Sequence, residues 1–383
     1  MSSLPITLPT SCEELLAQMV SFESVSLSFG GPPQGEARLA AHLESIAQRW
    51  GLQTRRCPVG DQAFNLLVTF EVSPTAEWLF FESHLDTVNV EGMTVPPFQL
   101  TPVGEKLHGR GACDTKGSGA AMLWALKAYA EQTQHPRNAG VIFSIDEEAS
   151  MDGAQAFAVH ELKEFLPRLR GIVVGEPTQL RPVVAHNGAL RWRTITRGVA
   201  AHSADPTKGR SAIAAMLKVI AALEQNFIPL ATRTDPLTGR AAASINVIRG
   251  GTAVNVIPDY CEIVCDRRLV PGETAAHVLA ERDAALSGLV VEHDEQYLAP
   301  PLPPGSSAEL HAWMQPAFAA ARIDGAATGA SYATNASHYA AAGAPVLVLG
   351  PGDIAQAHTK DEWLDRTALN EATAFYSALL QLP

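Results

Sequence analysis

Histidine and carboxylate side chains recur in this chain close to the ends of apolar runs. The first place is the run from Trp78 to Phe81, which is typical of a buried strand and is followed by His84 and Asp86. Residues two apart in a strand point the same way, so the two side chains can lie together. A carboxylate that orients an imidazole is common in metal sites, although a strand can also end in two polar residues without any metal.

Later apolar runs are followed by residues of the same kind. Glu147, Glu148 and Glu176 come directly after such runs, Asp114 stands before a long helix, and His358 follows the last run. The carboxyl ends of parallel strands meet at one edge of a sheet, so we expect these side chains to gather there.

Two imidazoles and three carboxylates are candidate metal ligands: His84, Asp114, Glu148, Glu176 and His358. They could hold two divalent ions if one carboxylate bridges. Two ions about 3.5–4 Å apart would hold a water molecule and lower its pKa towards neutrality. Glu147 cannot point the same way as Glu148 on an extended chain, so it is free to act as a general base. An acid pair can also be a solvated helix start, but five such residues near strand ends favour a metal site.

The periodicity of apolar residues predicts the elements that position this set. We expect strands at 65–70, 78–81, 140–145, 171–174 and 345–349. We expect helices at 11–20, 36–50, 118–131, 153–165, 307–322 and 367–380. Strands that alternate with helices predict an α/β fold whose sheet is largely parallel and flanked by helices.

The pattern changes after residue 182. Alternating strands are expected at 191–196, 242–248 and 255–266, with helices at 211–225 and 274–286, which predicts a smaller α+β domain with an antiparallel sheet. The first pattern returns after the proline cluster at 300–304. The predicted organisation is a catalytic domain at 1–182 and 295–383, interrupted by an inserted domain at 183–294.

Composition and charge limit the class of protein. The 383 residues are 46% apolar and 18% charged, as in soluble globular proteins of two domains. A net charge of −12 argues against partners such as nucleic acid or an anionic membrane. We expect no membrane span and no secretory signal. The five cysteines lack paired spacing, which favours reduced thiols in a cytoplasmic protein.

Four motifs resemble those of the dinuclear zinc amidohydrolases, the family of acetylornithine deacetylase, succinyl-diaminopimelate desuccinylase, aminoacylase-1 and glutamate carboxypeptidase. The resemblance extends in order over nearly the whole chain. The motifs are Ser83-His-Leu-Asp-Thr-Val88, Gly109-Arg-Gly-Ala-Cys-Asp-Thr-Lys-Gly117, Asp146-Glu-Glu148 and Gly175-Glu-Pro-Thr178.

The resemblance implies a role for each candidate ligand. Asp114 would bridge two Zn²⁺ ions, for which Co²⁺ or Mn²⁺ could substitute. His84 and Glu176 would complete the coordination of one ion, and Glu148 and His358 that of the other. A cis peptide bond would follow Asp114.

The resemblance also assigns catalytic and substrate-binding residues. Glu147 would be the general base, and Asp86 would orient the first histidine ligand. His202, in Gly198-Val-Ala-Ala-His-Ser of a lid and dimerisation domain, would reach across a homodimer to polarise the scissile carbonyl. Arg268 would bind a substrate carboxylate, and Asn255 would join it in the substrate site. Outside these motifs, His202 and Arg268 would be ordinary surface groups.

The C-terminal segment from Leu349 to Trp363 is most similar to the acetylornithine deacetylases within this family. The resemblance implies hydrolysis of an N-acyl amino acid, with N-acetylornithine deacetylation of the arginine-biosynthesis type as the first expectation. Asn335 stands where relatives carry an acid. If that acid binds a cationic end of the substrate, Asn335 would favour a substrate with a neutral end, such as that of citrulline. Asn335 would then itself be a substrate-binding residue.

Two classes of alternative stay open. One is a related hydrolase: an acetylcitrulline deacetylase, a succinyl-diaminopimelate desuccinylase, an aminoacylase, or a dipeptidase or carboxypeptidase. The other is a binding protein without catalysis on the same scaffold, which need not hold two metal ions.

Overall fold

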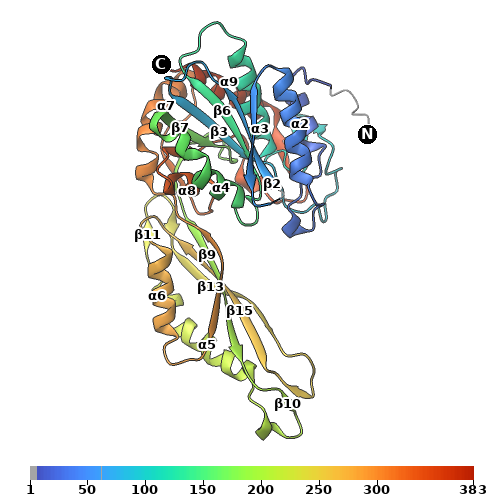
Figure 1. Ribbon diagram of the computed structural model, residues 1–383, viewed down its shortest axis with the longest axis vertical. Helices are drawn as coiled ribbons and strands as arrows, with labels where there is room; N and C mark the ends of the chain where they lie inside the picture. The colour runs from blue at the N-terminus through green and yellow to red at the C-terminus, as the bar shows by residue number, and fades with distance from the viewer. Residues whose placement is uncertain (1–6, 62) are drawn as a thin grey trace. The chain divides into compact units, whose positions relative to one another are not determined.

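The chain forms two compact units in a computed structural model that describes residues 7–61 and 63–383 (Figure 1). The first unit contains the chain up to residue 184, together with 304–328 and 334–383. The second contains 185–303 and 329–333. Residues 295–303 belong to the second unit because strand β16 (Glu292–Ala299) pairs with β9 (Gly188–Arg197).

An eight-stranded sheet runs through the first unit in the order β1-β2-β6-β3-β7-β18-β8-β17. Its central strands are mutually parallel: β6 (Asn138–Ser144), β3 (Trp78–His84), β7 (Leu169–Val174) and β18 (Val346–Val348). The outer strands are β1 (Gln53–Val59) and β2 (Ala63–Phe70) on one side and β8 (Val183–His186) and β17 (Thr328–Ala330) on the other. The predicted α/β fold is confirmed, with β2 and β8 pairing antiparallel to the parallel centre and β1 pairing antiparallel to β2 at the edge.

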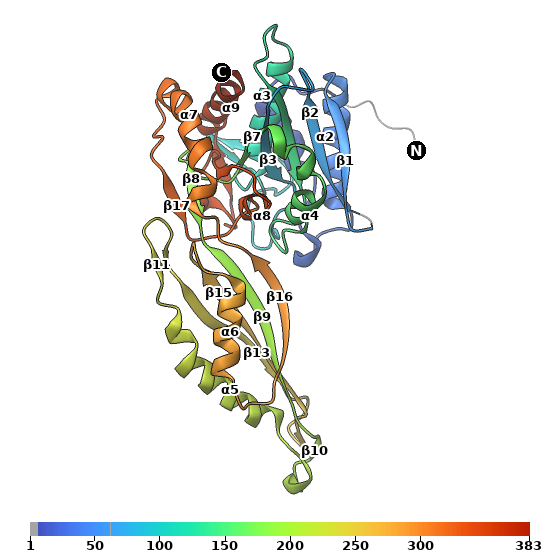
Figure 2. The same ribbon diagram turned by 60° about the vertical axis from the view of Figure 1, so that its left-hand side comes forward.

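Helices cover both faces of this sheet (Figure 2). The core on one face is built with α1 (Cys12–Val20), α2 (Gly35–Arg49), α3 (Lys116–Ala130), α7 (Ala308–Ala321) and α9 (Arg366–Gln381). The helices α4 (Asp152–His160) and α8 (Ala336–Ala341) contact each other, and Phe157 of α4 lies edge-on to Tyr339 of α8. A small sheet joins β4 (Thr101–Val103), β5 (Lys106–His108) and β19 (Trp363–Asp365).

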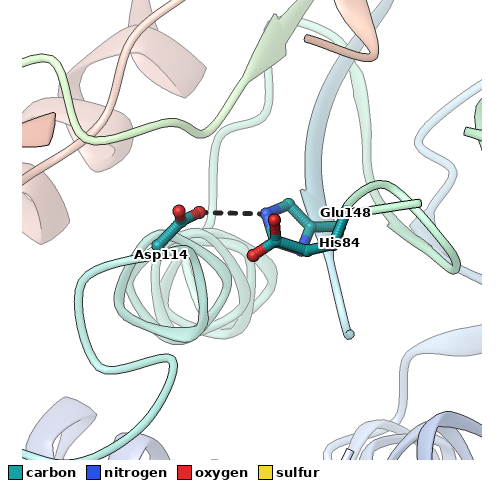
Figure 3. Close-up of side chains that lie close together, drawn as sticks. All are labelled: His84, Asp114 and Glu148. Carbon is teal, nitrogen blue, oxygen red and sulfur yellow. Dashed lines mark hydrogen bonds and ion pairs between the residues drawn. The ribbon is translucent and has the colours of Figure 1, made fainter. Parts of the chain in front are cut away.

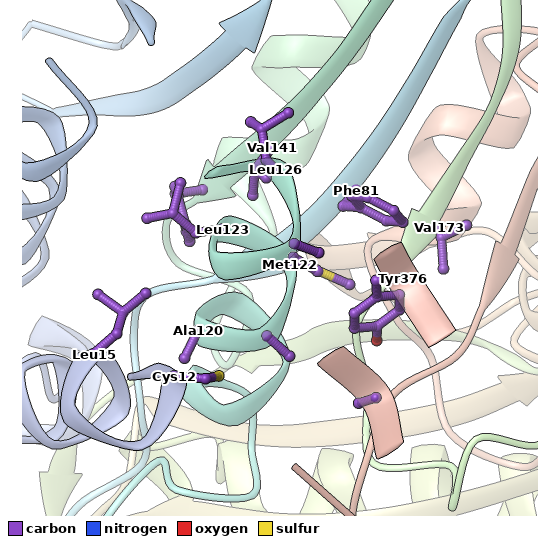
Figure 4. Packing of buried hydrophobic residues seen from close by; sticks show 14 of the residues in the cluster. Cys12, Leu15, Phe81, Ala120, Met122, Leu123, Leu126, Val141, Val173 and Tyr376 are labelled. Atoms are coloured by element: carbon purple, nitrogen blue, oxygen red, sulfur yellow. The ribbon is translucent and has the colours of Figure 1, made fainter. Parts of the chain in front are cut away.

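The helix α3 is the centre of the larger core. Most of its residues are buried, including Ala120, Met122, Leu123 and Leu126, because α1 and α9 pack against it while its inner side faces β3 and β6 (Figure 4). A helix that is apolar nearly all round is typical of such a position. Its first turn follows directly on Asp114, so this packing fixes one end of the candidate site.

The second unit is an antiparallel sheet with two helices, as the sequence pattern predicts. The strand order is β13-β15-β9-β16, with β13 (Ala242–Gly250) and β15 (Tyr260–Leu269). The helices are α5 (Ala212–Asn226) and α6 (Ala275–Ala285). Two short ladders pair β10 (Ala201–His202) with β14 (Val256–Ile257) and β11 (Thr234–Asp235) with β12 (Gly239–Arg240).

The segment Ala212–Leu230 corrects one sequence-based expectation. It is long and apolar enough to cross a membrane by length and composition, although no such run was expected. In the structure α5 buries Ala212, Met216, Val219 and Leu223 in the core of the second unit, while Leu217 on another side is exposed. Burial at intervals of three to four residues is typical of an amphipathic helix in a globular domain.

Candidate active site

His84 and Asp86 lie where β3 leaves the core. The imidazole of His84 is buried, and its Nδ1 donates a hydrogen bond to the backbone oxygen of Asp86 at 3.0 Å, with the Asp86 carboxylate 3.4 Å away. That carboxylate also accepts hydrogen bonds from the backbone N–H groups of Glu147, at 3.0 Å, and Glu148, at 2.9 Å. Asp86 therefore orients the histidine and also fixes the turn that carries the two glutamates.

The carboxylate of Asp114 lies between two imidazoles. Its Oδ1 is 3.1 Å from Nε2 of His84 (Figure 3). Its Oδ2 is 3.5 Å from Nε2 of His358. Nε2 of His358 also lies 2.9 Å from Oε2 of Glu148. The peptide bond between Asp114 and Thr115 is cis, as the family resemblance implies.

The structure brings the predicted ligands together around His84. Within the described chain, the ligand atoms of His84, Asp114 and Glu148 lie within 4.8 Å of one another, and so do those of His84, Glu147 and Glu176. Glu147, which the sequence assigns to proton transfer, therefore faces the same space as the ligand set.

Burial and mutual repulsion dominate the electrostatics of these carboxylates. Burial raises the pKa of Glu148 to about 7, with the charge of Asp114 acting in the same direction. Burial, and then the charge of Glu147, raises the pKa of Glu176 well above its usual range. Burial opposes protonation of His84, yet its hydrogen bonds to Asp114 and Asp86 raise its pKa well above the ordinary value.

This donor set fits divalent metal ions. Several carboxylates lie together with the buried imidazole of His84 and the more exposed one of His358, so their negative charges repel one another unless protons or cations offset them. Nitrogen and carboxylate oxygen donors together are suited to zinc and its neighbours in the first transition series. His84, Asp114, Glu148, Glu176 and His358 are the residues placed to hold such ions.

A cavity of about 300 Å³ in the first unit opens beside two of these residues. It is lined by Glu148 and His358 together with Phe29, Val88, Asn89, Glu91, Arg110, Thr359 and Lys360. Its wall is therefore mixed, with one aromatic ring and charged groups of both signs, which suits a small polar molecule better than an apolar one.

The sequence-predicted residues of the second unit fall in two places. His202 is exposed on β10, where its Nδ1 accepts a hydrogen bond from the N–H of Ala204 at 3.1 Å. The backbone oxygen of Asn255 accepts from Ser203 N–H at 3.0 Å, so His202 and Asn255 lie on adjacent segments. Arg268 lies on β15, where its Nε is 2.8 Å from Oδ1 of Asp266.

Asn335 is fully buried in the first unit. Its Nδ2 donates hydrogen bonds to Oε1 of Glu82 at 3.0 Å and to Oγ of Ser144 at 3.1 Å. Its Oδ1 has no hydrogen-bond partner among the described residues. The amide group is thus largely committed to an internal network next to β3, and only its oxygen is left to accept a bond.

Sequence reasoning missed buried charged residues around the site. Lys116, at the start of α3, is buried and donates to the backbone oxygen of Phe22 at 3.0 Å. Burial lowers the pKa of Lys116 to about 7. Glu36 accepts a hydrogen bond from the N–H of Asp146 at 2.8 Å, and Glu362 is buried beside the Asp114 loop. Lys116 stands in one of the family motifs and Glu362 in the C-terminal segment, but neither position in the sequence indicates burial.

Comparison with known proteins places this geometry in a family. Residues 80–382 match the profile of peptidase family M20/M25/M40. The chain belongs to this family. It is 32% identical to the acetylornithine deacetylase of Proteus mirabilis over 395 aligned positions, which cover 98% of this chain and 97% of the relative.

Solved structures of the M20 family share the fold. An M20 family metallo-carboxypeptidase from Sulfolobus solfataricus superposes with a TM-score of 0.77 at 15% identity, covering 98% of this chain and 99% of that one. A dinuclear metal-binding M20 peptidase from Bacillus subtilis has a TM-score of 0.66 at 16% identity, with 96% of each chain covered. As a member of the M20 family, this protein is a hydrolase of a metal-dependent class.

Proposed function

We propose that this M20 hydrolase uses two metal ions to cleave the amide bond of an N-acyl amino acid, with N-acetylornithine as the first candidate substrate. The observation that carries the proposal is the Asp114 carboxylate between His84 and His358, with Glu148 and Glu176 beside them. Likeness to a named acetylornithine deacetylase over nearly the whole of both chains supports the choice of substrate.

The proposed metal centre holds two Zn²⁺ ions per chain, with Co²⁺ or Mn²⁺ as substitutes. Asp114 would bridge, His84 and Glu176 would bind one ion, and Glu148 and His358 the other. When bound, the ions supply positive charge that polarises the scissile carbonyl and acidifies water.

Glu147 is the proposed general base. Its carboxyl group is close to His84 and Glu176, and burial, followed by repulsion from Glu148 and Asp86, raises its pKa well above the usual range. A carboxyl group with a raised pKa can take a proton from the attacking water and return it to the leaving amine. Asp86 holds the Glu147 backbone in place while this happens.

The remaining assignments concern substrate recognition. We propose that His202 of a partner protomer donates to the developing oxyanion and that Arg268 and Asn255 bind the substrate carboxylate end. Arg268 would have to exchange its ion pair with Asp266 for the substrate, whereas Asn255 offers an exposed side chain. Asn335 could contribute its free Oδ1, which accepts from N–H donors.

The proposed assembly is a cytoplasmic homodimer formed through residues 183–294. Ile213 and Leu217 of α5 and Ile248 of β13 are exposed apolar side chains on the second unit. Apolar groups of this kind favour a protein partner, and a second copy is the one that the family resemblance implies. The expected ligand is a small molecule, with neither nucleic acid nor membrane involved.

A substrate panel tests the proposed function. The purified enzyme with zinc would be assayed with N-acetylornithine, N-acetylcitrulline, N-succinyl-diaminopimelate, N-acetylmethionine and dipeptides. We expect the highest kcat/KM on N-acetylornithine and N-acetylcitrulline. Highest activity on dipeptides would contradict the deacetylase assignment and favour the peptidase activity named for the M20 carboxypeptidase of the same fold. No hydrolysis with full metal occupancy would contradict both.

A further inference from the structure

The carboxylate of Glu362 holds the loop that ends in Asp114. Its Oε1 accepts hydrogen bonds from the backbone N–H groups of Cys113, at 2.8 Å, and Asp114, at 2.9 Å. Its Oε2 accepts from the N–H of Gly111 at 2.9 Å and from Nη1 of Arg110 at 2.8 Å. The glutamate is only 1% exposed, so water does not compete for these bonds.

The strands on either side place Glu362 opposite this loop. Trp363 pairs with His108 where β19 meets β5, and the backbone oxygen of Glu362 accepts from Gly109 N–H at 3.1 Å. Gly109, the residue after β5, therefore begins the Asp114 loop beside the backbone of Glu362, and the side chain of Glu362 lies against the rest of that loop. A carboxylate surrounded by several backbone N–H donors is a rigid arrangement, because each bond to the charged group is stronger than a neutral one.

Arg110 extends the same network to the other side of the metal centre. Its Nη2 donates to the backbone oxygen of Thr359 at 3.1 Å, next to His358, and its Nε donates to that of Asn89 at 3.1 Å. The pair of Glu362 and Arg110 therefore joins the backbone of Asp114 to the backbone beside His358.

We propose that Glu362, together with Arg110, is a positioning residue that holds the Asp114 carboxylate between the two histidines and so sets the affinity for metal. This rests on the proposed function, in which Asp114 bridges two ions. It adds that the position of the Asp114 carboxylate is fixed by a residue outside the proposed ligand set.

The substitution Glu362→Gln tests this directly. The amide is close in size to the carboxylate, but its nitrogen cannot accept a hydrogen bond, so either the pair of N–H groups at Oε1 or the pair of donors at Oε2 loses its acceptor. Loss of an outer partner of a metal ligand commonly costs about 10–100-fold in metal affinity. We expect zinc affinity, measured by competition with a chelator, to fall by at least about tenfold.

Asp361 provides a matched control in the adjacent position. Its carboxylate likewise accepts from a loop, through the N–H of Thr94 at 2.8 Å, the N–H of Val95 at 3.3 Å and the hydroxyl of Thr94 at 2.6 Å. That loop carries none of the proposed ligands. Asp361→Asn therefore makes the same chemical change at the neighbouring residue, and we expect it to leave zinc affinity unchanged.

Amide hydrogen exchange of the metal-free protein gives a second measurement. In Glu362→Gln we expect faster exchange at Cys113 and Asp114 but not in the core helix α3. Hydrogen exchange is measured without zinc, so it tests the positioning role even if the parent chain binds no ion. Failure of the parent chain to bind zinc would contradict the proposed function but not this inference. Unchanged exchange at these amides would overturn the inference.

Two further results would also overturn the inference: unchanged zinc affinity in a folded Glu362→Gln variant, or an equal loss of affinity in Asp361→Asn. If Glu362→Gln does not fold, Glu362→Asp keeps the charge with a shorter reach. It must then show the same selective loss of zinc affinity, and normal affinity in it would overturn the proposal.

Discussion

At the scale of the residue, Glu147 and Glu148 are adjacent but have different neighbours. Oε2 of Glu148 lies 2.9 Å from Nε2 of His358, whereas the carboxyl group of Glu147 faces His84 and Glu176. The Asp86 carboxylate accepts hydrogen bonds from the backbone N–H groups of both glutamates. These bonds fix the backbone of the turn, so the two side chains cannot swap positions without breaking them. This arrangement supports a ligand role for Glu148 and a proton-transfer role for Glu147.

We expect the substitution Glu147→Gln to separate chemistry from binding. Glutamine is close in size to glutamate but cannot take a proton from water or return one to the leaving amine. General acid–base catalysis is commonly worth about 10²–10⁴ in rate, so turnover should fall by at least about two orders of magnitude. Steady-state kinetics would measure this, with metal content and substrate affinity determined on the same sample.

The metal content decides how that result is interpreted. Both ions should remain in Glu147→Gln, because none of the five proposed ligands is altered. Near-normal turnover would contradict the base assignment. Loss of metal would instead show that Glu147 takes part in binding the ions, as its place beside His84 and Glu176 allows.

The candidate ligands could be proposed from sequence because each stands in a short motif, four of them after an apolar run and Asp114 before a long helix. Their supporting residues could not. Glu362 and Lys116 look like ordinary surface charges along the chain, and only the approach of distant segments buries them. Glu362 is surrounded by N–H groups from residues about 250 positions earlier, a partnership that local pattern cannot indicate.

At the scale of the element, the strongly apolar central strands and the amphipathic helices could be predicted from the sequence. The polar strands at the edges of the sheets could not. The strand β1 contains two arginines and a proline, and β16 begins Glu-His-Asp-Glu, so neither has the apolar alternation of a half-buried strand. Both lie at the edge of their sheets, where one side faces solvent and such residues are tolerated. The short helix α8 has too few turns to show a period.

The glycine in Gly175-Glu-Pro-Thr178 shows how closely two elements approach at the site. A Cβ at Gly175 would lie 2.6 Å from Cβ of Ser118 on α3 and 3.1 Å from the backbone oxygen of Glu82 on β3. We expect Gly175→Ala to destabilise the protein by about 1–3 kcal/mol, the usual cost of overpacking a core. Thermal or denaturant unfolding of the metal-free protein would measure it.

Gly305 is the matched control for that substitution. Apart from the glycine itself and its two chain neighbours, no described heavy atom lies within 4 Å of the Cβ that alanine would add there, so Gly305→Ala should leave stability nearly unchanged. Equal stability of the Gly175→Ala variant and the parent would show that α3 and the strand ends can move apart, which would weaken the view that this packing fixes the ligands.

At the scale of the whole molecule, the first unit holds the full set of proposed ligands and the general base, whereas His202 belongs to the second. The chain therefore carries the proposed catalytic groups on two separately packed units. The family resemblance implies that the histidine acts on the site of another protomer, and the exposed apolar side chains of α5 support a dimer through the second unit.

Mixing two inactive variants tests this arrangement. A Glu147→Ala chain lacks the base but keeps His202, and a His202→Ala chain lacks the histidine but keeps Glu147. In a mixed dimer the chain that keeps Glu147 receives His202 from its partner, so one composite site is intact. We expect activity to appear on mixing, at a rate set by subunit exchange, and a size measurement to show a dimer. Each variant incubated alone is the control. If exchange is demonstrated with differently tagged chains and no activity returns, His202 does not act across the dimer, because the intact site must form in every mixed pair.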